Sequence, residues 1–196
     1  MKNHLTAIIF LIVSASAGAQ NTSGGASYTL GYFSPFGVHP GLKAGVELEL
    51  KAWEVAAEGD KAAKLRSLVL SPQLGYFANN NDYWAGLINA ELGYKRQRSG
   101  KKGWTMLSVG TGYLNQQKVT TVSTNLAGEK TLTRETRNFV QPSIHATFGR
   151  DFSAKLGGYA KLGYGKRFSG SAPDAGMLLL ELGLRFSPSG NPAASE

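Results

Sequence analysis

The tripeptide Leu92-Gly93-Tyr94 recurs along the chain as Leu30-Gly31-Tyr32, Leu74-Gly75-Tyr76 and Leu162-Gly163-Tyr164. In a β-strand, successive side chains point to opposite faces of the sheet. Each copy therefore places its Leu and Tyr on one face and leaves a bare glycine on the other. The recurrence predicts several strands that are apolar on one face and small or polar on the other.

Alternation of the same kind extends on both sides of these tripeptides. In segment 143–148, Ile144, Ala146 and Phe148 share one face, and Ser143, His145 and Thr147 share the other. Applied to the whole chain, the alternation and the turn residues between apolar runs predict eight strands. Their expected ranges are 28–34, 42–53, 65–77, 83–96, a fifth from Trp104, a sixth from Phe139, 153–168 and 176–186.

The first residues have the composition of a secretory signal peptide. Lys2 provides a basic start, Leu5 to Val13 form an apolar run, and Ala17-Gly18-Ala19 is a small-residue cleavage site before Gln20. The apolar run is shorter than the ~20 residues that a membrane-spanning helix needs. We therefore expect a signal peptide over 1–19, a polar leader over 20–27, a β-barrel domain over 28–186 and a polar tail over 187–196.

Composition excludes several kinds of chemistry. The chain of 196 residues contains no cysteine, so disulfides, thiolate catalysis and zinc–thiolate sites are impossible. Its formal net charge is +8, with a basic cluster at Lys95, Arg96, Arg98, Lys101 and Lys102. Since an exported protein rarely meets nucleic acid, this cluster indicates attraction to anionic lipid head groups or a solvated turn. We expect no nucleic-acid partner, no cofactor, no metal site and no catalytic residue.

Consecutive strands near the ~9–11 residues of a tilted membrane strand predict an all-β fold, an eight-stranded antiparallel transmembrane up-and-down β-barrel. A soluble periplasmic lipocalin-like barrel, with its apolar face inside, is the alternative. The glycines on the polar face favour the membrane form, because the interior of an eight-stranded barrel is narrow and filled by side chains. Tyr, Trp and Phe near the strand ends, resembling an aromatic girdle, favour it as well.

The membrane arrangement assigns a role to each face. The inner face is predicted to hold a charge network of Lys43, Glu47, Glu49, Lys51, Glu91, Lys95, His145, Lys161, Glu181 and Arg185. The lipid-facing set is Trp84, Leu92, Tyr94, Val109, Tyr113, Ile144, Phe148, Leu162, Tyr164, Leu180, Leu182 and Phe186. Charges of both signs in a narrow interior are expected to pair and fill it, because unpaired buried charge is costly. The alternative is a narrow, porin-like polar conduit.

Residues 28–186 resemble the small eight-stranded outer-membrane β-barrels of Gram-negative bacteria, the OmpA/OmpX-like group. The resemblance rests on the strand periodicity and on Leu178 to Phe186, which looks like the aromatic-ended closing strand read by the outer-membrane assembly machinery. This chain continues for ten residues beyond it, Ser187 to Glu196. The resemblance implies a monomer in the cell outer membrane, in contact with outer-membrane lipid, that serves envelope structure or surface interaction without enzymatic activity.

A lipid-modifying barrel enzyme remains an alternative from another class. Ser143 and His145 lie two residues apart on the inner face, and Glu91 or Glu181 would complete a hydrolase-like set. Such a set depends on hydrogen-bond geometry between nucleophile and base, and no catalytic motif surrounds these residues.

The segment 116–137 is polar with strand-compatible alternation and one turn near Asn125 to Gly128. Tyr113 and Phe139 are the last apolar, lipid-suited residues on either side of it. With both termini in the periplasm, strand counting places this connection outside the cell. We expect strands five and six to continue past the membrane as a protruding hairpin, a possible site for a surface partner.

Overall fold

A computed structural model describes residues 25–35, 39–56, 63–79, 83–124, 130–169 and 172–188. These residues form eight strands, which are β1 (Ala26–Pro35), β2 (Gly41–Val55), β3 (Lys64–Asn79), β4 (Tyr83–Arg98), β5 (Gly103–Thr124), β6 (Lys130–Asp151), β7 (Leu156–Ser169) and β8 (Ala172–Phe186). The predicted signal peptide and most of the predicted leader and tail lie outside the described residues.

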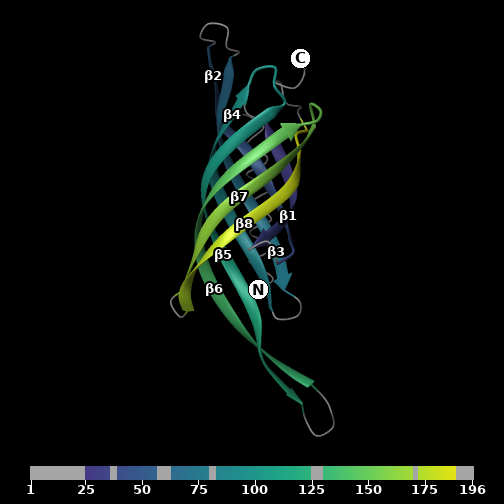
Figure 1. The fold of residues 1–196 in the computed structure, drawn as a ribbon, viewed down its shortest axis with the longest axis vertical. Coiled ribbons are helices and arrows are strands. Elements are labelled where there is room, and N and C mark those ends of the chain that lie inside the picture. The colour runs from purple at the N-terminus through teal and green to yellow at the C-terminus, as the bar shows by residue number, and fades with distance from the viewer. Residues whose placement is uncertain are drawn as a thin grey trace.

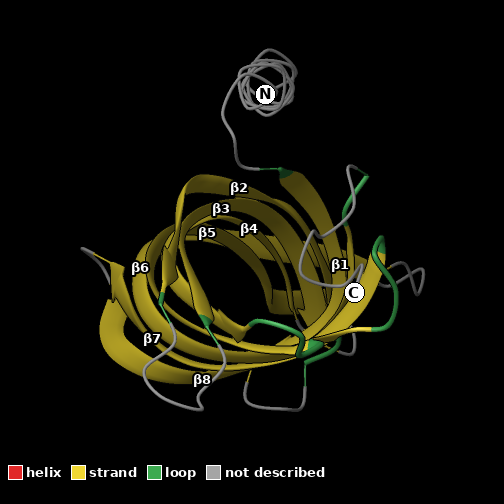
Figure 2. Cartoon of the chain, turned by 90° about the horizontal axis from the view of Figure 1, so that it is seen from above, coloured by secondary structure: helices red, strands yellow, loops and turns green. Residues whose placement is uncertain are grey.

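Each strand pairs antiparallel with the next, and β1 pairs with β8, so the sheet closes into a barrel (Figures 1 and 2). Gly31 lies opposite Gly183 in the closing pair, and Leu30 lies opposite Leu184. A closed ring leaves no unpaired sheet edge around its wall. The predicted eight-stranded antiparallel up-and-down barrel is therefore confirmed.

Strand ends differ from the predicted ranges by a few residues. β1 begins at Ala26 rather than at residue 28, and β7 begins at Leu156 rather than at residue 153. Before β7, the backbone N–H groups of Phe152 and Ser153 both donate to the Leu156 carbonyl, at 2.8 and 3.0 Å. These two hydrogen bonds close a tight turn over residues 152–156, where alternation alone predicts a strand.

A β-bulge in β2 overturns one predicted position. Glu49 lies opposite Val69, but Lys51 lies opposite Leu68, so Leu50 is the extra residue between them. Directly opposed residues share a face, and one extra residue moves every later side chain to the other face. Lys51 therefore lies on the outer wall and is exposed. The prediction that Lys51 belongs to the interior charge network is wrong.

The interior contains apolar side chains as well as polar ones. Near the β5–β6 end, a cluster of buried residues comprises Phe33, Phe77, Ala85, Leu87, Leu114, Phe139, Met177 and Leu179. A second cluster, towards the end where β1 begins and β8 ends, comprises Val69, Trp104, Met106 and Tyr159. Phe139 is only 7% exposed, so the prediction that it is lipid-suited is wrong. Its position on β6 shares a face with His145, which points inward.

Inward-facing glycines make room for large side chains of the neighbouring strand. A Cβ atom at Gly163 would lie 2.1 Å from His145 Cδ2, and one at Gly183 would lie 2.6 Å from the Tyr159 ring. His145 is opposite Gly163 in the register, and Tyr159 is opposite Gly183. The glycine of the recurring tripeptide therefore has a packing role at Gly163.

Gly163→Ala should destabilise the barrel by about 1–3 kcal/mol, the usual cost of overpacking a filled interior. The added methyl group would force the buried His145 ring away from its present place. Gly86→Ala is the matched control, because a Cβ there would meet no atom within 4 Å. Urea unfolding of both variants measures the difference, and equal stability of the two would contradict the packing role.

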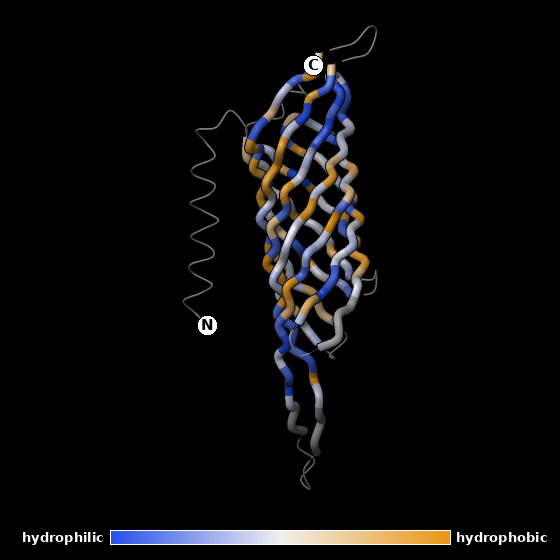
Figure 3. Tube along the Cα trace, turned by 90° about the vertical axis from the view of Figure 1, so that its left-hand side faces the viewer, coloured by the Kyte–Doolittle hydropathy of each residue, from blue (hydrophilic) through white to orange (hydrophobic). Residues whose placement is uncertain are grey.

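Large apolar side chains cover the outer wall. They include Leu30, Leu42, Leu107, Val109, Ile144, Phe148 and Leu182. Leu182 is 63% exposed and Leu42 is 64% exposed. Figure 3 shows apolar residues recurring along the barrel strands, whereas the described part of the projecting end is mainly hydrophilic. No helix in the described part of the chain is long and apolar enough to cross a membrane.

The strands β5 and β6 project beyond the other strands as a hairpin (Figure 1). They remain paired to Thr124 opposite Lys130. On one side, the pairing of β5 with β4 ends at Lys118. On the other side, the pairing of β6 with β7 begins at Val140. The predicted extension of strands five and six as a hairpin is confirmed.

Candidate functional site

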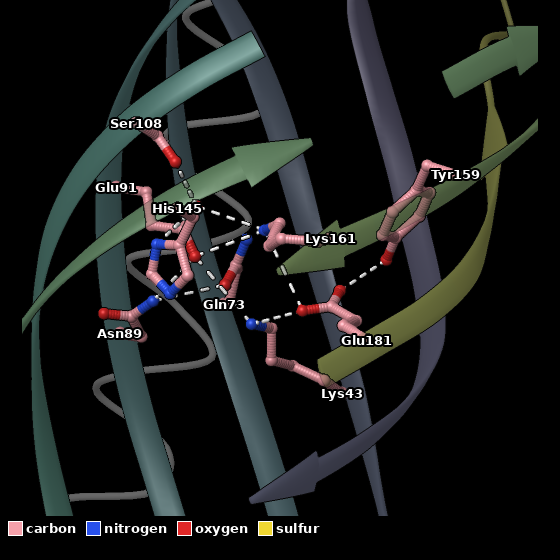
Figure 4. A network of polar contacts seen from close by, with 9 residues as sticks. All are labelled: Lys43, Gln73, Asn89, Glu91, Ser108, His145, Tyr159, Lys161 and Glu181. Atoms are coloured by element: carbon pink, nitrogen blue, oxygen red, sulfur yellow. Dashed lines mark hydrogen bonds and ion pairs between the residues drawn. The ribbon is translucent and has the colours of Figure 1, made fainter. Parts of the chain in front are cut away.

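The barrel interior holds a polar network centred on Glu91 of β4 (Figure 4). Lys161 Nζ donates to both carboxylate oxygens of Glu91, at 3.2 and 3.1 Å. Ser108 Oγ donates to Oε2 at 2.9 Å, and Asn89 Nδ2 donates to Oε1 at 3.0 Å. Glu91 is fully buried. Its charge is therefore held by hydrogen bonds from β4, β5 and β7.

A second carboxylate, Glu181 of β8, completes the network. Lys43 Nζ of β2 lies 2.5 Å from Glu181 Oε2, and the Tyr159 hydroxyl donates to Oε1 at 2.5 Å. Lys43 also lies 3.8 Å from Glu91, and Lys161 lies 3.8 Å from Glu181. Two carboxylates thus face two ammonium groups across the bore. Charges that are balanced and hydrogen-bonded in this way can be buried together.

A second polar group lies in the interior towards the end where β1 begins and β8 ends. Arg185 Nε of β8 lies 2.8 Å from Glu47 Oε2, and its Nη1 lies 3.6 Å from Asp151 Oδ1. Arg185 Nη2 donates to Ser27 Oγ at 2.8 Å. Lys95 Nζ lies 4.5 Å from the centroid of the Trp104 ring, an arrangement that stabilises a cation on an aromatic face. These groups and the Trp104 cluster fill that end of the bore.

Most of the predicted interior set is brought together in these two groups. Lys43, Glu91, His145, Lys161 and Glu181 meet in the central network. Glu47, Lys95 and Arg185 lie towards the end where β8 ends, and Glu49 is half-buried beside the bulge. Lys51 alone lies on the outer wall.

The predicted charge network omits several of its interior partners. They are Ser27, Gln73, Asn89, Ser108, Asp151 and Tyr159. Their positions follow the inward alternation of their strands, so the alternation could have identified them. The predicted network contains only titratable residues, so the neutral hydrogen-bonding groups on the same face are absent from it. Asp151 is the last residue of β6, outside the segment 143–148 in which the alternation is clearest.

The residues predicted to face lipid lie on the outer wall. Eleven of them are exposed, from Tyr94 at 39% to Leu182 at 63%. Trp84 is half-buried because its ring packs against Tyr76, with the ring centroids 6.1 Å apart. Contact with lipid itself stays a prediction.

In the hydrolase-like set, the imidazole of His145 makes no hydrogen bond to Glu91. His145 is 3% exposed, and its Nδ1 lies 3.6 Å from Glu91 Oε2, beyond hydrogen-bonding distance. Glu91 is held by Lys161, Ser108 and Asn89 rather than oriented toward the imidazole. Among the described residues, no group of three or more His, Asp or Glu side chains is placed to hold a metal ion.

On the projecting hairpin, most described side chains are polar and exposed, and Val119 is half-buried. Arg137 Nε and Nη2 donate to the two carboxylate oxygens of Glu135, at 2.8 and 3.0 Å. These hydrogen bonds lower the pKa of Glu135. Asn115 Nδ2 donates to Asn138 Oδ1 across the two strands at 2.7 Å. The base of the hairpin is therefore ordered by polar contacts suited to water.

No protein-family model matches the sequence, and no curated protein sequence matches it either. In three dimensions the chain is similar to the N-terminal β-barrel domain of Pseudomonas aeruginosa OprF, at 15% identity and a TM-score of 0.48, covering 84% of this chain and 99% of that one. Neisserial surface protein A is similar at 12% identity and a TM-score of 0.48, covering 83% of this chain and 94% of that one. The fold assignment rests on the hydrogen-bonded ring described above.

Proposed function

We propose that this chain is an integral outer-membrane β-barrel with a filled interior, which serves envelope structure or surface interaction and has no enzymatic role. The observation that carries the proposal is the arrangement of the two faces. Large apolar side chains such as Leu42 and Leu182 are exposed on the wall, while the charged Glu91 and Lys161 are buried inside. A soluble lipocalin-like barrel has the reverse arrangement.

The lack of hydrogen-bonding groups in the bilayer core also supports a location in the outer membrane. Lipid offers no hydrogen-bond partners, so a spanning sheet must close upon itself to satisfy its backbone groups. The ring from β1 to β8 does so. The apolar side chains on its wall would be costly in water and are favourable against acyl chains. The expected secretion signal supports export, and the outer membrane is the usual location of barrels of this kind.

The filled bore favours a structural barrel over a narrow pore. The central network links side chains of β2, β4, β5, β7 and β8 across the interior, and an apolar cluster lies on each side of it. An ion crossing the bore would have to break these paired charges.

Cell fractionation and planar-bilayer recording test this proposal together. We expect the full-length protein in the outer-membrane fraction, with a gel mobility that changes on heating, and no unitary conductance after reconstitution. Recovery as a soluble periplasmic protein would overturn the membrane assignment. Steady single-channel conductance would instead establish the pore.

The projecting hairpin is the element best suited to a surface interaction. Beyond Lys118 on β5 and before Val140 on β6, these strands pair only with each other among the described strands. Their outer edges are thus available for pairing with an added strand, a recurring mode of peptide recognition. Binding of a partner strand at this edge would give the hairpin a function, since the barrel closes without it.

Replacing residues 119–134 by Asn-Gly should leave the barrel folded and heat-resistant. The replacement joins Lys118 to Glu135, which lie directly opposite each other, and Asn-Gly suits a two-residue hairpin turn. Gel mobility before and after heating reports the fold, and adhesion to host or bacterial cells reports the interaction. Adhesion should fall with the hairpin removed. A failure to assemble would contradict the separation of hairpin and barrel.

A further inference from the structure

A ladder of cations lies on the outer wall where β3 and β4 approach the end of the barrel opposite the hairpin (Figure 1). Lys64 is directly opposite Arg98, and Arg66 is directly opposite Arg96. The four residues share the outward face, because Leu68, which follows Arg66 on that face, pairs with Tyr94. We call Lys64, Arg66, Arg96 and Arg98 the cation ladder.

Nothing in the described part of the protein neutralises these charges. None of the four forms an ion pair with a described acidic residue. Arg66 Nε is buried and has no hydrogen-bond partner among the described residues. Like charges directly opposite in a sheet are destabilising. The arrangement therefore calls for an anion that accepts hydrogen bonds from two neighbouring guanidinium groups.

The surroundings of the ladder indicate the source of that anion. On the same face, the next two opposed pairs along β3 and β4 are Leu68–Tyr94 and Leu70–Leu92. The bulge in β2 turns Trp53 onto this face opposite Arg66, where its ring centroid lies 6.1 Å from that of Tyr94. Aromatic rings of this kind are typical of the boundary between head groups and hydrocarbon. The four cations of the ladder therefore lie directly next to aromatic rings and apolar side chains that suit contact with lipid.

We propose that the cation ladder binds the phosphate of an anionic glycerophospholipid whose acyl chains lie along Leu68, Leu70 and Leu92. Arg66 and Arg96 together offer planar guanidinium donors that match phosphate oxygens in pairs. Lys64 and Arg98 lie one step further from the apolar pairs, where an anionic head group extends into water. This inference rests on the proposed membrane location.

Lipid retention by the full-length protein provides the test. The protein is reconstituted in vesicles of phosphatidylcholine alone or mixed with phosphatidylglycerol, and the phospholipid that stays bound after detergent extraction is identified by native mass spectrometry. We expect wild type to retain phosphatidylglycerol preferentially. Arg66→Gln combined with Arg96→Gln should lower that retention roughly fivefold for each cation removed. Lys118→Gln with Arg134→Gln, which removes two exposed cations from the hairpin, should leave it unchanged.

Additional measurements distinguish a failure of folding from a failure of lipid binding. Urea unfolding in phosphatidylcholine vesicles checks that the double variant folds, and Arg96→Gln alone, with an exposed side chain, replaces it where folding fails. Excess inorganic phosphate should not displace the lipid, because it lacks acyl chains. Displacement by phosphate, equal retention in the ladder variant, or equal loss in the hairpin control would each overturn this inference. If wild type fails to insert into either kind of vesicle, the proposed membrane location falls as well.

Discussion

Glu91→Gln should destabilise the barrel by about 3–5 kcal/mol, the cost of removing one partner from a buried ion pair. Glu91 is fully buried and accepts both hydrogen bonds from Lys161 Nζ. Glutamine has nearly the same shape but carries no charge. The central network would then hold two ammonium groups, Lys43 and Lys161, against the single carboxylate of Glu181.

The free energy of unfolding in urea, followed by tryptophan fluorescence in vesicles, measures this effect. Glu91→Gln combined with Lys161→Met is the matched control, since it leaves Lys43 paired with Glu181 at 2.5 Å. The double variant should recover most of the lost stability, because the uncompensated charge is gone. A single variant within about 0.5 kcal/mol of wild type would show that water, rather than Lys161, satisfies Glu91.

The number of strands, their order and the orientation of most side chains could be predicted from sequence. Alternation is a local property, and residues such as Glu91 and Leu92 on β4 follow it without interruption. The β2 bulge could not be predicted from the alternation up to residue 52, which continues without a break. Only Trp53, an aromatic residue at a position of the polar face, departs from the pattern. The position of the bulge depends on pairing with β3, where Glu49 and Lys51 meet consecutive residues. Lys51 was misplaced for that reason.

The aromatic residues of the interior could be predicted less completely than its charged residues. Trp104 and Phe139 are aromatic residues near strand ends, a pattern that also suits a membrane girdle, yet both side chains are buried inside. Contacts across the bore depend on the stagger of the strands around the barrel, which fixes the axial level of each side chain. That stagger brings Lys43 of β2 to Glu181 of β8. Alternation within one strand carries no information about it.

Leu92→Arg, one residue along from Glu91, should impair membrane insertion by about 2–4 kcal/mol, the cost of a cation on the lipid face near the midplane. Leu92 is 44% exposed and lies between Leu70 and Val109 on the outer wall. Neither apolar neighbour can pair with the added guanidinium. The fraction of protein that acquires heat-modifiable mobility in preformed vesicles measures insertion.

Thr136→Arg is the control for the added charge, because Thr136 is exposed on the hairpin and the new side chain would remain in water. It should insert as wild type does. Gly93→Arg should fail for a different reason, since a Cβ at Gly93 would already lie 2.7 Å from Met106 Sδ inside the barrel. In a lipocalin-like barrel the outer wall faces water, so Leu92→Arg would be tolerated and the protein would be recovered from the periplasm. The adjacent positions 92 and 93 therefore distinguish lipid from water on the outside of the same strand.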